Sequence, residues 1–563
     1  MSAIQHTLRG ILPLAAIHHL PMELLTYIFL LVQGSLDNSY SGWIAIAGTC
    51  RDWRNIAIST PSLWSIIGPD HDKNAVQDWL MRSKNYPLSV NRNVSQQQHL
   101  TPLRKILNEM LRIRILRLTI RPILWDKVQD FISLKAPMLE ELSIKYPEGR
   151  RLRGRIVIPQ TIFSDCAPLL TRVTISRCLF SLNSPIFRGL TGLCIENPIC
   201  RLDLETILQA LQQMPQLLSL ALHRSFYASM FSASSGSKTL SAVTLPCLKT
   251  LDVSDAVLFE PGEIIEGIDL LSNLRYPATA AVMVTLYVVG LERSERGLIT
   301  FRELLLLYNR QYIGTGLPIK GIFFQAHPYR VRIQLCHQFK EDILLQFTQR
   351  SPDLEWDYTP LIESLSTLTL SEVSWLKINT VLPSTIWRRV LSQLVNLQDL
   401  TIYEDGADSF LDYLNEYYSS SPAPFAYADS DDCSGWKVSA SSDGNEDEDT
   451  SARAQPAEGG DDAQVIGHCV RVIAPGIPYR LSKLTLDGIR PEEHPLRGVL
   501  QGLIQKREFG PSLDNLQLFF YGKEELEMVQ PFRELANYFA YSFKIRVPQS
   551  SDEETIDLNN YLD

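Results

Sequence analysis

Cysteine and histidine are the residues of this chain best suited to chemistry, either as zinc ligands or as a nucleophile and its base. The nine cysteines include no C-x-x-C pair, and this spacing disfavours zinc. Only the dipeptides Cys336-His337 and His468-Cys469 place two possible ligands side by side. Most cysteines lie in apolar or strand-like contexts, which predicts reduced, buried thiols. We therefore predict no metal site.

Motifs that support catalysis are missing from the sequence. It contains no G-x-x-x-x-G-K-S/T or G-x-G-x-x-G loop, no G-x-S-x-G turn and no H-E-x-x-H pair. Distant residues can still assemble a triad, so an enzyme with a pocket between structural repeats stays open as an alternative. The prediction is that the chain has no catalytic residues and no cofactor, and that it acts by binding.

Size and charge restrict the kind of partner. A chain of 563 residues is too long for one core, and 45% hydrophobic with 21% charged residues is typical of a soluble protein. Most of the net charge of −10 belongs to residues 419–465, which hold eleven acidic and two basic residues, so no nucleic-acid surface is expected. The best apolar run, residues 278–291, is too short to span a membrane. We expect a cytoplasmic or nuclear protein.

Residues 18–68 have the pattern of a three-helix unit. Pro21 suits the start of a helix because its missing N–H would be unpaired there, and Glu23 favours the same end. Apolar residues then recur at helical spacing until Gly34 and the polar residues after it end the helix. Two shorter helical segments follow, and Leu63-Trp64 close the unit. So small a unit barely supports its own core, and its large apolar residues therefore predict docking on a partner.

The same segment resembles the F-box domain. The family pattern combines leucine-proline, an acidic residue and isoleucine-phenylalanine with a cysteine-arginine-x-tryptophan-arginine run and a final proline-x-leucine-tryptophan. This sequence matches the pattern at Leu20-Pro21, Glu23, Ile28-Phe29, Cys50-Arg51, Trp53-Arg54, Pro61 and Leu63-Trp64. Residues 56–64 are similar in form to the F-box proteins of mushroom-forming fungi, whereas residues 33–42 are longer than in the shortest family members.

F-box domains bind the Skp-type adaptor of a cullin-based ubiquitin ligase. The resemblance therefore implies that adaptor as a partner and, through it, the cullin. It also implies seven adaptor-binding residues, which either contact the adaptor or shape the surface that does: Leu20, Pro21, Leu24, Ile28, Phe29, Trp53 and Trp64. The alternative for each residue is that it packs the core of the small unit.

From about residue 101 a triplet of the form L-x-x-L-x-L recurs, with Leu, Ile or Val at its three positions. It begins at residues 113, 139, 170, 190, 217, 248, 365, 397, 481 and 513. A proline stands two residues before five of these, where it stops a helix and lets the chain turn into a strand. Beside the last two apolar positions, 25 of 30 residues are polar or glycine, which is the alternation of a strand with one solvated face.

Short strands separated by helical stretches predict an α/β architecture, an irregular solenoid similar to leucine-rich repeats. Residues 255–360 leave the triplet pattern and contain β-prone segments at 282–289, 319–325 and 331–335. We expect these segments to form longer strands within the same sheet. A separate small domain is the alternative.

The predicted organisation has seven parts. They are an N-terminal extension (1–17), an F-box-like helical domain (18–68), a linker (69–100), the solenoid (101–417), a disordered acidic insertion (418–465), the continued solenoid (466–548) and an acidic C-terminal tail (549–563). The insertion has few apolar residues, so it cannot bury enough surface to become ordered. It is either a solvating spacer or a regulatory segment phosphorylated at Ser430, Ser441 or Ser442.

We interpret the chain as the substrate-recognition subunit of a Skp-cullin-F-box ubiquitin ligase, which raises the concentration of a protein substrate at the ligase. The substrate would lie on the polar strand residues, because rigid elements hold them. The candidates are Arg117, Glu141, Lys145, Arg172, His223, Asp252, Asp399, Tyr403, Lys483 and Asp487. The alternatives are that these are ordinary solvated strand residues, or that the chain is a scaffold that never joins a ligase.

Overall fold

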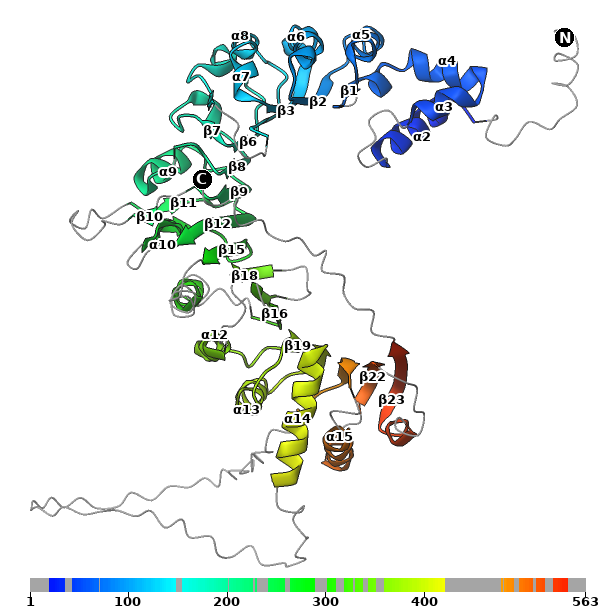
Figure 1. Ribbon diagram of the computed structural model, residues 1–563, viewed down its shortest axis with the longest axis vertical. Coiled ribbons are helices and arrows are strands. Elements are labelled where there is room, and N and C mark those ends of the chain that lie inside the picture. The colour runs from blue at the N-terminus through cyan, green and yellow to red at the C-terminus, as the bar shows by residue number, and fades with distance from the viewer. Residues whose placement is uncertain are drawn as a thin grey trace, which may run out of the picture. The chain divides into compact units, whose positions relative to one another are not determined.

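A computed structural model describes residues 20–35, 43–69, 71–147, 154–200, 202–225, 228–229, 241–258, 264–288, 301–309, 318–327, 330–337, 343–350, 359–420, 477–478, 480–490, 496–509, 513–521 and 530–544 (Figure 1). The chain divides into two compact units. The first comprises Met1–Thr380, Asp399–Tyr403 and Arg546–Asp563, and the second comprises Val381–Gln398 and Glu404–Ile545. Helices and strands are mixed in both, and parallel pairing dominates the strands.

Three of the predicted segments fall largely or wholly outside the described residues. They are the extension 1–17, the acidic tail 549–563 and all of the insertion beyond residue 420, including its three candidate phosphorylation sites.

The first unit begins with helices α2 (Met22–Ser35), α3 (Ile44–Thr49) and α4 (Arg51–Ser59) and the 3-10 turn η2 (Pro61–Trp64). Pro21 starts α2, because its carbonyl accepts hydrogen bonds from the N–H groups of Leu24 and Leu25, both over 3.1 Å. Cys50 caps α4, because its thiol sulfur accepts a hydrogen bond from the N–H of Trp53. Helix α2 packs against α4 and η2, which makes these elements one helical group.

Residues 69–100, predicted as a linker, instead contribute to the fold. They include helix α5 (Lys73–Arg82) and strand β2 (Leu88–Val94), which pairs in parallel with β1 (Ile66–Ile67) and with β3 (Ile113–Ile120). Strand β2 buries every second residue, but one of these is Arg92. The Arg92 guanidinium donates to the carbonyls of Gly68 and His71, over 2.6 and 2.8 Å. A buried arginine thus interrupts the apolar alternation by which a strand is found in sequence.

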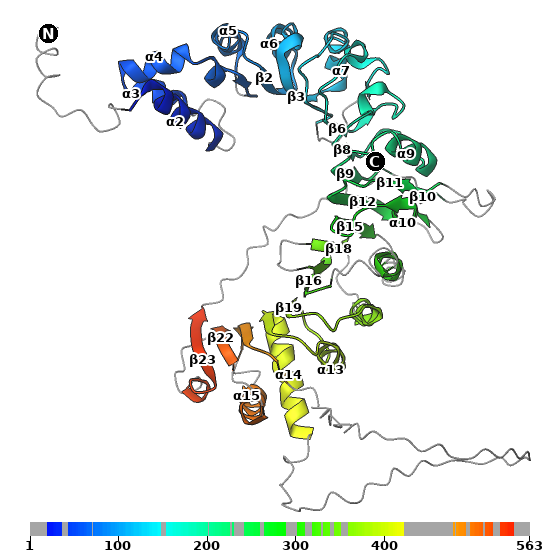
Figure 2. The same cartoon turned by 180° about the vertical axis from the view of Figure 1, so that it is seen from behind.

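The sheet of the first unit continues with parallel strands that pair in chain order. After β3 they are β4 (Glu141–Lys145), β6 (Arg172–Ser176), β8 (Gly192–Glu196), β9 (Ser219–His223), β12 (Thr250–Leu258) and β15 (Ala281–Val288). Between β2 and β3 lie η3 (Gln97–His99), α6 (Leu100–Leu107) and η4 (Met110–Arg112). Between the later strands lie α7 (Pro122–Trp125), α8 (Gln129–Ile132), α9 (Leu204–Leu211) and α10 (Glu266–Asn273), together with the 3-10 turns η5 (Ile162–Asp165) and η6 (Pro185–Phe187). Figure 2 shows α5, α6, α7 and α9 on one side of the strands, and none of the described helices covers the other strand face there.

Three pairs of two-residue strands lie outside this sheet. They are β5 (Ile156–Val157) with β7 (Cys178–Leu179), β10 (Ala228–Ser229) with β13 (Ile264–Ile265), and β11 (Val243–Thr244) with β14 (Leu274–Arg275). They join neighbouring connecting segments by backbone hydrogen bonds, and so fix the connections as well as the strands.

A tight turn precedes four of the strands, at the positions where the sequence has proline. The N–H groups of Leu139, Leu170, Leu217 and Leu248 each donate to the carbonyl three residues earlier, over 3.1–3.2 Å. In each case proline is the second residue of the turn, where its fixed φ is favourable. The apolar residues of these triplets are buried, so the prediction of strands with one buried face is confirmed for β4, β6, β9 and β12.

The longer strands expected within residues 255–360 are present in the same sheet. Strand β17 (Arg330–Cys336) pairs antiparallel with both β16 (Gly321–His327) and β18 (Ile343–Arg350), while β18 pairs in parallel with β15, and β16 with β19 (Trp375–Asn379). Strand β19 pairs in parallel with β20 (Asp399–Tyr403). The alternative of a separate small domain is therefore not what the structure contains.

The strand predicted from the triplet at Leu365 is wrong. Helix α12 (Thr359–Ser364) ends there, and Leu365–Thr367 is a 3-10 turn, η7. The strand forms instead at a second triplet, Val373, Leu376 and Ile378, whose side chains are all buried. Two successive triplets compete in this sequence, and pairing with β16 selects the later one.

The second unit contains helices α13 (Ser384–Gln393), α14 (Asp405–Ser420) and α15 (Arg497–Phe509), the 3-10 turn η8 (Gln530–Phe532), and strands β21 (Lys483–Ile489), β22 (Leu513–Tyr521) and β23 (Ala536–Lys544). These three strands are parallel and pair in chain order. Trp387 of α13 packs on Phe410 of α14, with ring centroids 4.9 Å apart and both rings buried. The Asp408 carboxylate, only 4% exposed, accepts a hydrogen bond from the N–H of Arg490, which ties α14 to the end of β21.

Candidate binding surfaces

Helix α2 has two apolar faces. One packs into the chain's own core, because Leu25 and Phe29 are only 5% and 1% exposed. The other faces solvent: Leu24, Tyr27 and Leu31 are 49%, 60% and 54% exposed. Their spacing of three and then four residues places them on one stripe of the helix. We call Leu24, Tyr27 and Leu31 the α2 stripe.

The tryptophans next to α2 form an internal cluster. The rings of Trp43, Trp64 and Trp79 lie 4.7–6.4 Å apart in edge-to-face orientations, which aromatic rings favour. Trp64 is 3% exposed and donates its indole N–H to the carbonyl of Ala57 over 2.8 Å. The guanidinium of Arg82 lies 4.3 Å from the Trp64 ring centroid. Because Trp79 and Arg82 belong to α5, the core of this region extends beyond residues 18–68.

For two of the predicted adaptor-binding residues, this burial favours the alternative that they pack in the core. Trp64 and Phe29 are core residues, and Phe29 packs on the ring of Trp53 over 5.2 Å. Of the other five, Pro21 and Leu24 are exposed, while Leu20, Ile28 and Trp53 are half-buried. Tyr27 and Leu31 were not among the residues predicted from the sequence. The available signal was that apolar residues occur on nearly every side of residues 22–32, more than one buried face requires.

The second surface is the helix-free face of strands β3 to β12. The register places Lys145, Ser176, Glu196 and His223 in one row across β4, β6, β8 and β9. Glu141 and Arg172 are neighbours in a second row. We call the charged side chains of this face the polar strand face: Arg117, Glu141, Lys145, Arg172, Glu196, His223 and Asp252.

Two arginines from neighbouring strands share Glu141. One carboxylate oxygen, Oε1, lies 2.5 Å from Nε of Arg117, and Oε2 lies 3.2 Å from a terminal nitrogen of Arg172. Burial is the largest influence and raises the pKa of Glu141, but the hydrogen bonds and charges of the two arginines together outweigh it and lower that pKa. Arg172 lies over Gly192 of β8, where an added Cβ would stand 3.2 Å from its Cγ. Glycine thus leaves room for an arginine whose side chain stays 60% exposed.

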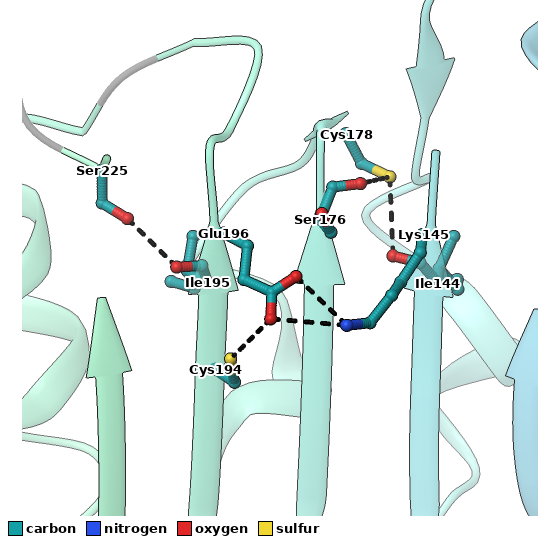
Figure 3. Close-up of polar contacts among 8 residues, drawn as sticks. All are labelled: Ile144, Lys145, Ser176, Cys178, Cys194, Ile195, Glu196 and Ser225. Atoms are coloured by element: carbon teal, nitrogen blue, oxygen red, sulfur yellow. Dashed lines mark hydrogen bonds and ion pairs between the residues drawn. The ribbon is translucent and has the colours of Figure 1, made fainter. Parts of the chain in front are cut away.

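Lys145 and Glu196 form the next pair, across the intervening strand β6 (Figure 3). The Lys145 Nζ lies 3.3 and 3.1 Å from the two carboxylate oxygens. Burial is the largest single influence on the pKa of Glu196 and raises it, but the hydrogen bonds and the charge that lower this pKa, those of Lys145 first among them, together outweigh burial. The thiol of Cys194 donates to the same carboxylate over 3.6 Å. Glu196 was not among the predicted site residues, although it flanks the triplet that begins at residue 190.

The two cysteines in this neighbourhood are poor nucleophiles. Burial, aided by the charge of Glu196, raises the pKa of Cys194 to about 12. Burial likewise raises the pKa of Cys178 to about 12, and its thiol donates to the carbonyl of Ser176 over 3.2 Å (Figure 3). Because a thiolate is the reactive form, both side chains serve as hydrogen-bonded packing groups at neutral pH.

His223 and Asp252 form the last pair of the polar strand face. The His223 Nε2 lies 3.3 Å from the Asp252 Oδ2, on the neighbouring strand β12. The hydrogen bond to Asp252 raises the pKa of His223; burial opposes this, and the charges of Asp252 and Glu196 add to it. Protonated His223 is therefore stabilised chiefly by Asp252 on β12; the charge of Glu196 on β8 adds to this, and the charge of Lys145 on β4 opposes it.

The structure does not bring all ten predicted substrate residues into this group. Six of them belong to the polar strand face. The others are half-exposed on different strands: Asp399 and Tyr403 on β20 in the first unit, and Lys483 and Asp487 on β21 in the second. Thr401, between Asp399 and Tyr403, donates its hydroxyl to the Asp399 carboxylate over 3.2 Å.

In the part of the chain that the structure describes, no three His, Cys, Asp or Glu side chains are grouped to hold a metal ion. Cys336 is buried, the Nδ1 of His337 lies 3.1 Å from the carbonyl of Pro318, and His468-Cys469 falls outside the described residues. None of the described helices is long and apolar enough to cross a membrane. In comparisons with known proteins, the chain matches no family model and no curated protein.

Proposed function

We propose that the chain is the substrate-recognition subunit of a Skp-cullin-F-box ubiquitin ligase. In this proposal α2, α3 and α4 form an F-box-like domain that binds a Skp-type adaptor. The strands and helices after them form a leucine-rich-repeat-like solenoid that binds a protein substrate. The chain brings adaptor and substrate together, and the bond-forming chemistry belongs to the rest of the ligase.

The observation that carries the proposal is the exposure of the α2 stripe. The opposite side of α2 already packs Leu25 and Phe29 into a core, so Leu24, Tyr27 and Leu31 are not needed for the fold of the helix. Large apolar side chains at this spacing are those by which a helix enters a hydrophobic groove of a partner. Each would contribute roughly 0.8–1.5 kcal/mol on burial, because full burial of such a side chain contributes about 1.5–3 kcal/mol and about half of each is already buried.

The polar strand face supports the second half of the proposal. Its side chains stand on paired strands, which hold them in place without help from a ligand. Arg117 and Arg172 share the single carboxylate of Glu141 and remain 48% and 60% exposed. This end of the face therefore presents two partly exposed guanidinium groups, which favours a substrate segment rich in carboxylates.

Binding of a purified Skp-type adaptor to the full chain tests the proposal. Leu24→Glu combined with Leu31→Glu replaces two of the three apolar side chains of the α2 stripe by charges, and we expect the affinity to fall by at least about a hundredfold, as for loss of interface anchors. Leu111→Glu is the matched control, since Leu111 is a leucine 65% exposed on a different element, before β3. Capture of the double variant at the wild-type level, or no binding by the wild-type chain, would refute the proposal.

Recovery of the cullin tests whether the adaptor-bound chain reaches a ligase. We expect the cullin to co-purify with the wild-type chain and to be lost together with the adaptor in the double variant. An adaptor that is retained without any cullin would instead favour a scaffold that never joins a ligase.

A further inference from the structure

Strand β23 ends the parallel strands of the second unit with a long edge. It runs over Ala536–Lys544 and pairs with β22 along its length. Among the described residues, β22 is the only strand that pairs with it. The N–H and C=O groups along its other side therefore form a row that can accept a further strand.

The core side of β23 is less covered than that of the strand beside it. Phe539 and Tyr541 stand in register with Leu516 and Leu518 of β22, so the four side chains point to the same face. Both leucines are 0% exposed, whereas Phe539 and Tyr541 are half-exposed, with their rings stacked 5.6 Å apart. Tyr538, on the opposite face, is 56% exposed. An additional strand alongside β23 would cover this aromatic surface.

The sequence of β23 also lacks the usual protection of an edge. Proteins commonly place charges or proline on an exposed edge strand, or keep that strand very short. Residues 536–543 contain no charged residue and no proline, and the strand is nine residues long. Its first charge is Lys544, at the very end. Nothing in these eight residues opposes pairing with an identical strand.

We propose that β23 pairs with β23 of a second copy of the chain, in antiparallel orientation about a twofold axis. A twofold axis uses the same edge on both sides, which satisfies both rows of backbone groups at once. Parallel pairing would place Lys544 beside its counterpart. Antiparallel pairing separates the two lysines by about 27 Å, at about 3.4 Å per residue over eight residues. Arg533 and Glu534, just before the strand, have opposite charges and add no net repulsion.

One pair of strands is a small interface, so the dimer should be concentration-dependent and of micromolar affinity. Sedimentation of the full chain from about 1 to about 100 μM should show a shift from monomer to dimer, because a micromolar Kd lies in this range. A chain that stays monomeric throughout would overturn the proposal.

A charge-swap experiment at Ala540 tests the location and the symmetry of the contact. Ala540 is the middle residue of the solvated row, opposite Gln517 of β22, so a long side chain there is compatible with the fold. Ala540→Lys and Ala540→Glu should each weaken dimerisation at least tenfold, because identical charges then face each other. An equimolar mixture of the two variants should restore the dimer, which also shows that both are folded.

Gln517→Lys provides the matched control, because it adds the same charge to the same face on the interior strand β22. This variant should dimerise as the wild type does. Unchanged dimerisation of the two Ala540 variants, or a mixture no tighter than either alone, would place the contact elsewhere and overturn the proposal.

Discussion

The two terminal strands of the chain's sheets, β1 and β23, end those sheets in different ways. Strand β1 has two residues and follows directly after Trp64, which is buried among aromatic rings. Strand β23 has nine residues, and two of its aromatic rings are half-exposed on the core side. The first end presents little free backbone and little apolar surface, whereas the second presents both.

The difference lies in the side chains that cover the last strand at each end. At β1 the covering side chains come from separate helices, such as Trp79 and Arg82 of α5. Among the described residues just before β23, the buried apolar side chains are Phe532 and Leu535. Terminal units of stacked strand arrays need a cap, and the chain builds one at its beginning. That cap is the group of elements that also carries the α2 stripe.

Replacing one aromatic residue at each end should produce the largest contrast. Trp64→Ala removes a ring that is 3% exposed and should lower the free energy of unfolding by about 3–5 kcal/mol, as for other buried aromatic residues. Tyr538→Ala removes a ring that is 56% exposed and should change it by less than about 0.5 kcal/mol. Urea unfolding followed by circular dichroism measures both. Equal losses would show that the two ends are equally covered.

The buried side chain of Arg92, on β2 next to β1, provides a second test of how well this end is covered. Arg92→Met should lower the free energy of unfolding by about 2–3 kcal/mol, because the carbonyls of Gly68 and His71 lose their donor in a dry site. Arg172→Met is the control, since that side chain is 60% exposed and its ion pair is worth about 0–1 kcal/mol. Comparable losses in the same urea titration would argue that Arg92 is not structurally important.

The sequence predicts most of the strands because their physical causes are local. Apolar triplets with polar flanks describe a strand that is buried on one side, and proline before Leu139 or Leu170 matches a turn whose geometry favours it. Strand β2 escaped prediction because Arg92 occupies a buried position that apolar periodicity cannot reveal. The strand predicted at the Leu365 triplet does not form, because pairing with β16 selects the triplet at Val373 instead. Strand β16 is distant in sequence, so no local pattern reveals this choice.

The candidate surfaces were less predictable than the strands. Helical periodicity does not distinguish an apolar face that packs in the chain's own core from one that binds a partner, so it left both roles open for Phe29 and assigned no role to Tyr27. Trp64 is covered by Trp79, which lies in a segment with no obvious pattern. The ion pairs of the polar strand face depend on the register of strands 24 to 51 residues apart in sequence, which no local signal contains.

The pH dependence of stability should come from the polar strand face. Substitutions near β1 or on β23 should therefore leave it unchanged. The pKa of His223 is raised from 6.5, so its contribution is fully present below pH 6.5 and is lost as the pH rises through the folded-state value. The pKa values of Glu141 and Glu196 are lowered from 4.5, so their contributions are present above pH 4.5 and are lost as the pH falls. Stability should thus be greatest between about pH 5 and 6.5, with a small amplitude because the groups are partly solvated.

His223→Gln should abolish the decline above pH 6.5 and leave the decline on the acid side, because Asp252, Glu196 and Lys145 then face an uncharged side chain. Melting temperatures from pH 4 to 9 measure this for the wild type, His223→Gln and Tyr538→Ala. The Tyr538→Ala curve should run parallel to that of the wild type, since this ring lies on β23, away from the polar strand face in sequence and in strand order. If the melting temperature of His223→Gln still falls above pH 6.5, another group causes the decline at alkaline pH. If the curve of Tyr538→Ala differs in shape from that of the wild type, a titrating group near β23 contributes to the pH dependence.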